Sequence, residues 1–63
     1  MGLERRYIKL KKRQRNTMTG QEFQKNEVLY IHKHDDTGLV LLDPRNSLRR
    51  LYIKLDFDII ELV

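Results

Sequence analysis

Hydrophobic residues occupy every second position in several short segments of this chain, a spacing that predicts β-strands. In residues 7–11, Ile8 and Leu10 share one face, so Tyr7 and Lys9 share the other. Further segments rich in apolar and β-branched residues, with turn signals between them, lie at 27–34, 39–43, 49–55 and 59–63. A basic helix over residues 3–15 is the competing interpretation, but strict alternation favours a strand. The pattern therefore predicts an all-β chain of five strands.

The segments between these strands carry loop and turn signals. Residues 14–22 lack periodicity and contain Gly20, which predicts a long loop or an irregular hairpin. The sequences HDDTG and DPRNS predict tight turns. The unbroken apolar run LVLL predicts a third strand that is buried on both faces. The predicted core consists of Ile8, Leu10, Leu29, Ile31, Val40, Leu42, Leu51, Ile53, Ile59 and Leu62.

From residue 22 onward, the spacing of turns and strands resembles that of the SH3-like barrels. EFQKNEVLYI looks like the diverging turn of that family, with Lys25, Asn26 and Glu27 ahead of the alternating residues Leu29 and Ile31. DDTGLVLL and LYI look like the next two strands, and LDFDIIELV looks like a short 3₁₀ turn leading into the last one. The resemblance implies an SH3-like small barrel of five strands with a long first loop, and the short length of the chain predicts a single domain over residues 1–63.

The functions that the resemblance implies are diverse. SH3 domains of signalling proteins hold proline-rich segments between aromatic side chains. Here Leu39 and Val40 stand where a tryptophan pair would begin, and Lys54 stands where a binding-surface proline would be. Phe57 keeps an aromatic ring near the position of the family's binding tyrosine. Binding of proline motifs is therefore not expected. Other SH3-like barrels, in bacteria, ribosomes and mobile elements, bind nucleic acid or other proteins.

Size and composition limit the means by which this chain can be stabilised. It has 63 residues and no cysteine, so no disulfide can form and the usual zinc-ligand spacings are absent. A core this small is often completed by self-association, and the apolar residues of IIELV at 59–63 would suit a second copy of the chain. No apolar run approaches the roughly 18 residues of a membrane span. A cytoplasmic protein is expected.

The positive charge is concentrated at one end of the sequence. The net charge is +4, yet residues 1–15 carry seven cations against Glu4, and residues 55–63 carry three acids and no cation. Exposed lysine and arginine side chains displace counterions from a phosphate backbone, and tyrosines among them can stack on bases. The alternative without a ligand is that these charges protect an exposed edge strand from aggregation. The predicted DNA- or RNA-binding residues are Arg5, Arg6, Tyr7, Lys9, Lys11, Lys12, Arg13, Arg15, Tyr30, Arg49 and Arg50.

Two other kinds of function are alternatives to nucleic-acid binding. The first is a protein-interaction module, such as a phage, plasmid or bacterial regulator, that docks on a larger partner through Tyr30, Leu39, Tyr52 and Phe57. The second is metal binding by HKHDD, but two histidines and an aspartate lack the further ligands that a stable site needs. No nucleophile is coupled to a base and no glycine-rich phosphate loop is present, so neither an enzyme nor a cofactor is predicted.

Overall fold

The alternating segments form strands in the computed structural model, which describes residues 6–63. The strands are β1 (Tyr7–Leu10), β2 (Gln14–Arg15), β3 (Glu22–Phe23), β4 (Val28–Asp35), β5 (Gly38–Asp43), β6 (Asn46–Ile53) and β7 (Ile60–Leu62). The predicted all-β class is confirmed, and residues 6–15 contain two strands instead of the competing helix. A helix that is long and apolar enough to cross a membrane does not occur in residues 6–63.

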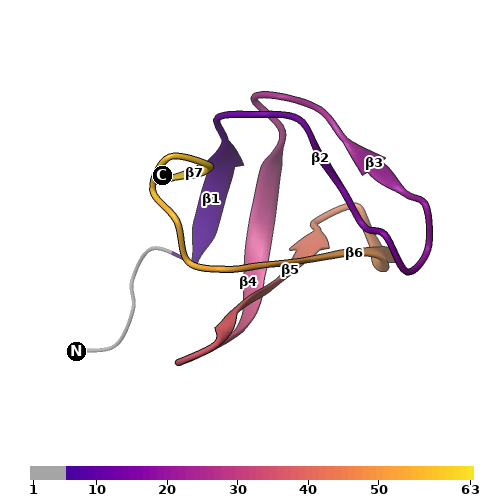
Figure 1. The fold of residues 1–63 in the computed structure, drawn as a ribbon. Coiled ribbons are helices and arrows are strands. Elements are labelled where there is room, and N and C mark those ends of the chain that lie inside the picture. Colours follow the sequence, from indigo (N-terminus) through magenta and orange to yellow (C-terminus); the bar gives the residue numbers. More distant parts are fainter. Residues whose placement is uncertain (1–5) are drawn as a thin grey trace.

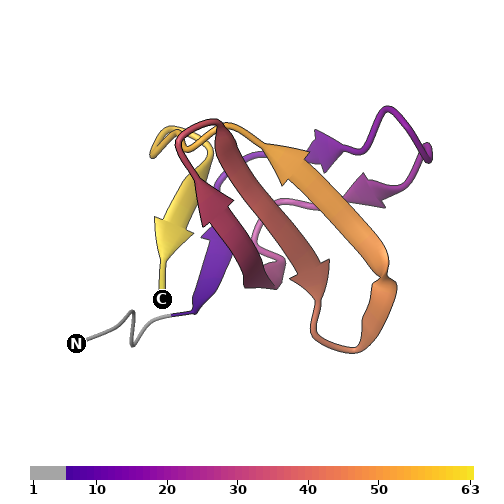
Figure 2. The same cartoon turned by 90° about the horizontal axis from the view of Figure 1, so that it is seen from below.

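Five of the strands form one antiparallel sheet in the order β6-β5-β4-β1-β7 (Figure 1). Strand β1 lies inside the sheet, with Ile8 opposite Leu29 of β4 on one side and Leu62 of β7 on the other. The sheet is strongly twisted, as the different directions of β1 and β6 show (Figure 2). The predicted closure into a barrel is wrong, because β6 and β7 remain the two edges of this sheet within residues 6–63.

Of the two alternatives predicted for residues 14–22, a long loop or an irregular hairpin, the structure contains the hairpin. Strands β2 and β3 pair with each other, Gln14 opposite Phe23 and Arg15 opposite Glu22, as a separate two-stranded sheet beside the main one (Figure 1). The side chain of Phe23 is completely buried and joins the core of the main sheet. The hairpin is therefore anchored to the rest of the protein through an aromatic side chain.

The core is built mainly from the inward-facing side chains of β1, β4, β5 and β6. Of the predicted core, Ile8, Leu10, Leu29, Ile31 and Leu51 are buried, and Ile53 and Ile59 pack against them while partly exposed. The buried residues that the prediction missed are Phe23, Leu39, Leu41 and Ile60. The prediction was wrong for Val40 and Leu42, which are half-exposed, and for Leu62, which is exposed.

The error in β5 has a simple physical cause. Every residue of LVLL is apolar, so the sequence contains no signal that separates the inward from the outward positions. The register settles the choice, because Leu41 lies opposite Ile31 of β4 and Leu51 of β6, and both of these side chains are buried. Strand β5 therefore buries one face fully and the other only in part.

The turn before β4 needs one residue with an unusual backbone. Asn26 has a positive φ of 75°, a conformation that asparagine tolerates better than most residues. In this turn the Asn26 N–H donates a hydrogen bond to the Leu10 carbonyl at 2.7 Å, and the Leu10 N–H donates to the Glu27 carbonyl at 2.9 Å. Asn26 thus fixes the start of β4 against the end of β1.

Candidate nucleic-acid interface

The solvent-facing side of the main sheet carries aromatic and basic side chains in register across four strands. Tyr7 lies opposite Tyr30, Tyr30 lies opposite Leu42, and Leu42 lies opposite Arg50, which forms one row from β1 to β6. A second row joins Lys33, Val40 and Tyr52, and a third joins Val28, Lys9 and Glu61. We call this surface the outer face; its residues are Tyr7, Lys9, Val28, Tyr30, Lys33, Val40, Leu42, Arg50, Tyr52 and Glu61.

Two tyrosines of the outer face, on β1 and β4, contact each other and a neighbouring arginine. The rings of Tyr7 and Tyr30 meet edge to face with their centres 5.5 Å apart. Arg6 donates a hydrogen bond to the Tyr30 hydroxyl at 3.2 Å and places its guanidinium 5.6 Å from the centre of the Tyr30 ring. Because Tyr7 remains 42% exposed, its ring is open to a stacking partner. Aromatic rings beside a guanidinium are the arrangement on which bases stack.

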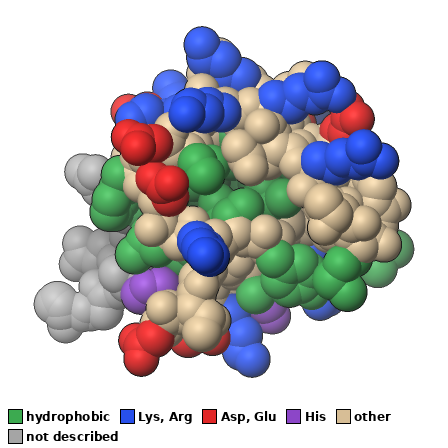
Figure 3. Space-filling view, in the orientation of Figure 1, with side chains coloured by type: hydrophobic (Ala, Val, Ile, Leu, Met, Phe, Trp, Pro, Cys, Tyr) green, Lys and Arg blue, Asp and Glu red, His purple; other side chains and the backbone are tan. Residues whose placement is uncertain are grey.

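The charge of the outer face is distinctly positive. Including Arg6, it carries four cations, and Glu61 is its single carboxylate. The other described acids lie in turns, in β3 or at the ends of strands, and Glu22, Glu27 and Asp43 form ion pairs with arginines. They are not among the residues of the outer face, which therefore stays basic. Figure 3, which shows the molecule in the orientation of Figure 1, displays lysines and arginines interspersed with acids around a hydrophobic centre. The positive charge is thus spread over several elements instead of being confined to one.

The basic segment predicted from the sequence does not form one continuous exposed row. Strand β1 ends at Leu10, so the alternation that places Tyr7 and Lys9 on the same face does not extend to Lys11. Lys11 donates a hydrogen bond to the Phe57 carbonyl at 2.8 Å, and Arg13 forms an ion pair with Glu22. Lys12 and Arg15 are exposed in the β1–β2 connection and in β2. Arg5 lies outside the described residues.

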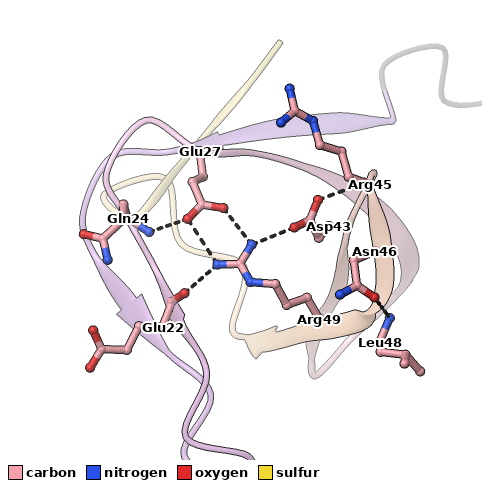
Figure 4. A network of polar contacts seen from close by, with 8 residues as sticks. All are labelled: Glu22, Gln24, Glu27, Asp43, Arg45, Asn46, Leu48 and Arg49. Atoms are coloured by element: carbon pink, nitrogen blue, oxygen red, sulfur yellow. Dashed lines mark hydrogen bonds and ion pairs between the residues drawn. The ribbon is translucent and has the colours of Figure 1, made fainter.

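Arg49 and Arg50, predicted together as phosphate contacts, point to opposite sides of β6. Arg50 belongs to the outer face, opposite Leu42. Arg49 points inward, where it contacts Glu27 Oε1 at 3.1 Å and Asp43 Oδ2 at 2.7 Å and donates to the Glu22 carbonyl at 2.6 Å (Figure 4). Its role is therefore to join β6 to the turn before β4 and to the β2–β3 hairpin, and we leave it out of the candidate interface.

The contacts among Arg49, Glu27 and Asp43 determine the direction in which their pKa values are shifted. Hydrogen bonds to Glu27 and then to Asp43 raise the pKa of Arg49 further above its already high value. The hydrogen bond from Arg49 is the main cause that lowers the pKa of Glu27. The pKa of Asp43 is lowered first by the backbone N–H of Arg45 and then by Arg49. Arg49, Glu27 and Asp43 are all charged at neutral pH, so one cation lies between two carboxylates within the fold.

Asn16 is a structural residue that no pattern in the sequence singles out. Its side chain is 4% exposed, and its Nδ2 donates a hydrogen bond to the Arg50 carbonyl at 2.7 Å. Its Oδ1 accepts a hydrogen bond from the Met18 N–H at 2.9 Å, which closes the turn of the β2–β3 hairpin. Arg50 is thus held on β6 by a contact from the hairpin to its backbone.

The surface predicted for a protein partner is only partly exposed. Tyr52 and Phe57 are 51% and 57% exposed, and Tyr30 is half-buried on the outer face. Leu39 was wrongly included, because it is 4% exposed and belongs to the core. This residue was predicted to face outward because the prediction interchanged the inward and outward positions of β5.

A register shift in β4 interrupts the regular alternation that would place His32 and His34 on one face. A bulge in β4 between Ile31 and Lys33 leaves His32 without a partner and places His34 opposite the buried Leu39. Both histidines are exposed, and residues 6–63 contain no group of three histidine, aspartate or glutamate side chains placed to hold a metal ion. The same bulge brings Lys33 onto the outer face, a placement that the sequence pattern alone did not indicate.

The fold and the outer face define a small all-β protein with an aromatic and basic sheet surface. No protein-family model matches the chain, and no curated protein or solved structure shows significant similarity to it.

Proposed function

We propose that this protein binds nucleic acid without catalysing a reaction, through the phosphate backbone and the cations of the outer face. The observation that carries the proposal is the row of Tyr7, Tyr30 and Arg50 across four strands, with Arg6 on Tyr30 and Lys9 beside Tyr7. Cations with aromatic rings on one surface suit a ligand that is both anionic and rich in planar groups. The predicted residues that remain in the proposal are Arg6, Tyr7, Lys9, Tyr30 and Arg50, and Lys33 is added to them.

We further propose that the fold is an open variant of the SH3-like barrel. The support is the strand order, in which β1 lies between β4 and the last strand, and the long connection from β1 to β4 that contains a hairpin. A short turn at Asp56, whose carbonyl accepts a hydrogen bond from the Ile59 N–H at 2.9 Å, leads into β7 in the way the resemblance implies. An accessory or regulatory role in the cytoplasm is the setting we propose for such a domain.

Two charge-matched double variants test which cations contact the phosphates. Lys9→Gln with Lys33→Gln removes two charges from the outer face, whereas Lys12→Gln with Arg15→Gln removes two from the connection and hairpin. Binding of a fluorescein-labelled oligonucleotide is measured by anisotropy at 50 and 200 mM NaCl. We expect the first pair to weaken binding by about 10-fold and to reduce the slope of log K against log salt by about 1.5. The second pair should change the affinity less than about threefold.

Equal effects of the two pairs would contradict this assignment of the interface, and absence of binding at 50 mM NaCl would contradict the proposed function.

The second candidate function, binding of a protein partner, is favoured by the exposure of Leu55, which is 47% exposed, together with Phe57 and Tyr52. A pulldown that recovers one protein after nuclease treatment, and loses it in Phe57→Ser, would support that candidate instead.

A further inference from the structure

A shallow hollow lies on the sheet where the β4–β5 turn meets the end of β6. Its volume is about 250 Å³, and Val40 and Tyr52 of the outer face contribute to its lining. Lys33 and Lys54 also line this hollow, so two cations, an aromatic ring and an apolar side chain meet there. Asp35 also lines it, but its carboxylate accepts hydrogen bonds from the Thr37 N–H at 2.8 Å and from the Thr37 hydroxyl at 2.6 Å.

The lining indicates the chemistry of a ligand. Tyr52 is 51% exposed, and its ring and Val40 offer an apolar surface, while the two lysines of the lining offer positive charge. A planar ring joined to phosphates on both sides fits this combination, and a nucleotide within a strand has that form. In a duplex, however, the faces of the bases are stacked on one another, so only an unpaired base can lie flat on Tyr52.

A second exposed ring lies at the other end of the outer face. Tyr7 is separated from β6 by two intervening strands, β4 and β5. With strands spaced at about 4.8 Å, the two exposed tyrosines lie on the order of 15 Å apart across the sheet. Lys9, Lys33 and Arg50 belong to the surface between or beside them. One single strand can therefore meet both rings and the cations along the same path.

We propose that the outer face prefers single-stranded nucleic acid to duplex, with one base stacked on Tyr52 in the hollow and another on Tyr7. Lys33 and Lys54 contact the phosphates that flank the first base. This inference rests on the proposed function, because it specifies the form of nucleic acid that the same surface binds. Stacking on one aromatic residue changes affinity by about 5- to 100-fold in single-strand binding proteins.

The test compares three labelled probes by fluorescence anisotropy at 50 mM NaCl: dT12, rU12 and a 12-base-pair DNA duplex. The variants are Tyr52→Leu, Tyr52→Phe, and the matched control Phe57→Leu, which removes an equally exposed ring outside the hollow. We expect dT12 or rU12 to bind at least about 10-fold more tightly than the duplex. Tyr52→Leu should weaken binding of the preferred single strand by at least about fivefold, whereas Tyr52→Phe and Phe57→Leu should change it by less than about twofold.

The outcomes separate this inference from the proposed function. If the duplex binds as tightly as the single strands, or if Tyr52→Leu acts no more strongly than Phe57→Leu, the single-strand inference is overturned and the proposed function stands. If none of the three probes binds, both are overturned. Thermal unfolding of each variant identifies any loss of binding that comes from loss of folding. Because Tyr52→Phe keeps the ring and removes only the hydroxyl, retained binding in this variant shows that the ring is the group that matters.

Discussion

The Arg49 guanidinium lies 4.3 Å from the centre of the Phe23 ring, so a charge on β6 covers the aromatic anchor of the β2–β3 hairpin. The same guanidinium binds Glu27 and Asp43, and all three side chains are about one quarter exposed or less. One residue thus connects the main sheet, the hairpin and the turn before β4. The stability of the whole fold is expected to depend on it.

Replacement of Arg49 by methionine should lower the free energy of unfolding by about 2 kcal/mol. The methionine keeps an apolar stem over Phe23 but leaves two neighbouring carboxylates without their partner. For a domain of this size, the loss corresponds to a fall in Tm of about 10 °C. The control is Arg50→Met, an exposed neighbour for which we expect a change below about 0.5 kcal/mol. Urea denaturation followed by circular dichroism measures both, and equal losses would show that Arg49 has no special role.

The stabilisation by Arg49 should depend on pH. The pKa values of Glu27 and Asp43 are lowered in the folded protein, so their contribution is complete above the ordinary carboxyl pKa of about 4 and disappears as the pH falls through the lowered values. The difference in unfolding free energy between wild type and Arg49→Met is therefore expected to be smaller at pH 3 than at pH 6. Urea titrations at the two pH values test this, and an unchanged difference would argue against the ion pairs as its source.

The turn at Asn26 should discriminate between alanine and glycine. Asn26→Ala places an ordinary side chain at a positive φ and is expected to cost about 1 kcal/mol. Asn26→Gly should stay within about 0.5 kcal/mol of wild type, since glycine adopts this conformation freely. Chemical denaturation of both variants gives the comparison. A loss as large in the glycine variant as in the alanine variant would mean that the side chain matters more than the backbone.

Gly38 is required for a different reason, namely the close approach of another strand. A Cβ atom at this position would be driven into the backbone carbonyl of Ile53 on β6. Gly38→Ala is therefore expected to destabilise the fold by about 2 kcal/mol. At Gly20 a Cβ would meet only the end of the Arg15 side chain, at 4.0 Å, so Gly20→Ala should cost the roughly 1 kcal/mol of its positive φ alone. Thermal unfolding of the two variants should rank them in this order.

Sequence patterns predicted the strands more accurately than they predicted the surface. Alternation identified the inward side chains of β1 and β4, such as Ile8 and Leu29, because polar residues mark the opposite face. In β5 no polar residue marks either face, so Leu39 and Val40 were interchanged. Local spacing does not reveal that Arg49 lies inside the fold or that Lys33 lies on the outer face, because hydrogen bonds between distant segments and a bulge determine where these side chains lie.

Contact between nucleic acid and the outer face can be observed residue by residue by ¹H–¹⁵N NMR of the full chain titrated with dT12. We expect the largest amide shifts at Tyr7, Lys9, Lys33, Arg50 and Tyr52, which come from three strands and meet only on this face. Shifts confined to residues 11–15 and the β2–β3 hairpin, with the outer face unchanged at saturation, would contradict this location of the interface.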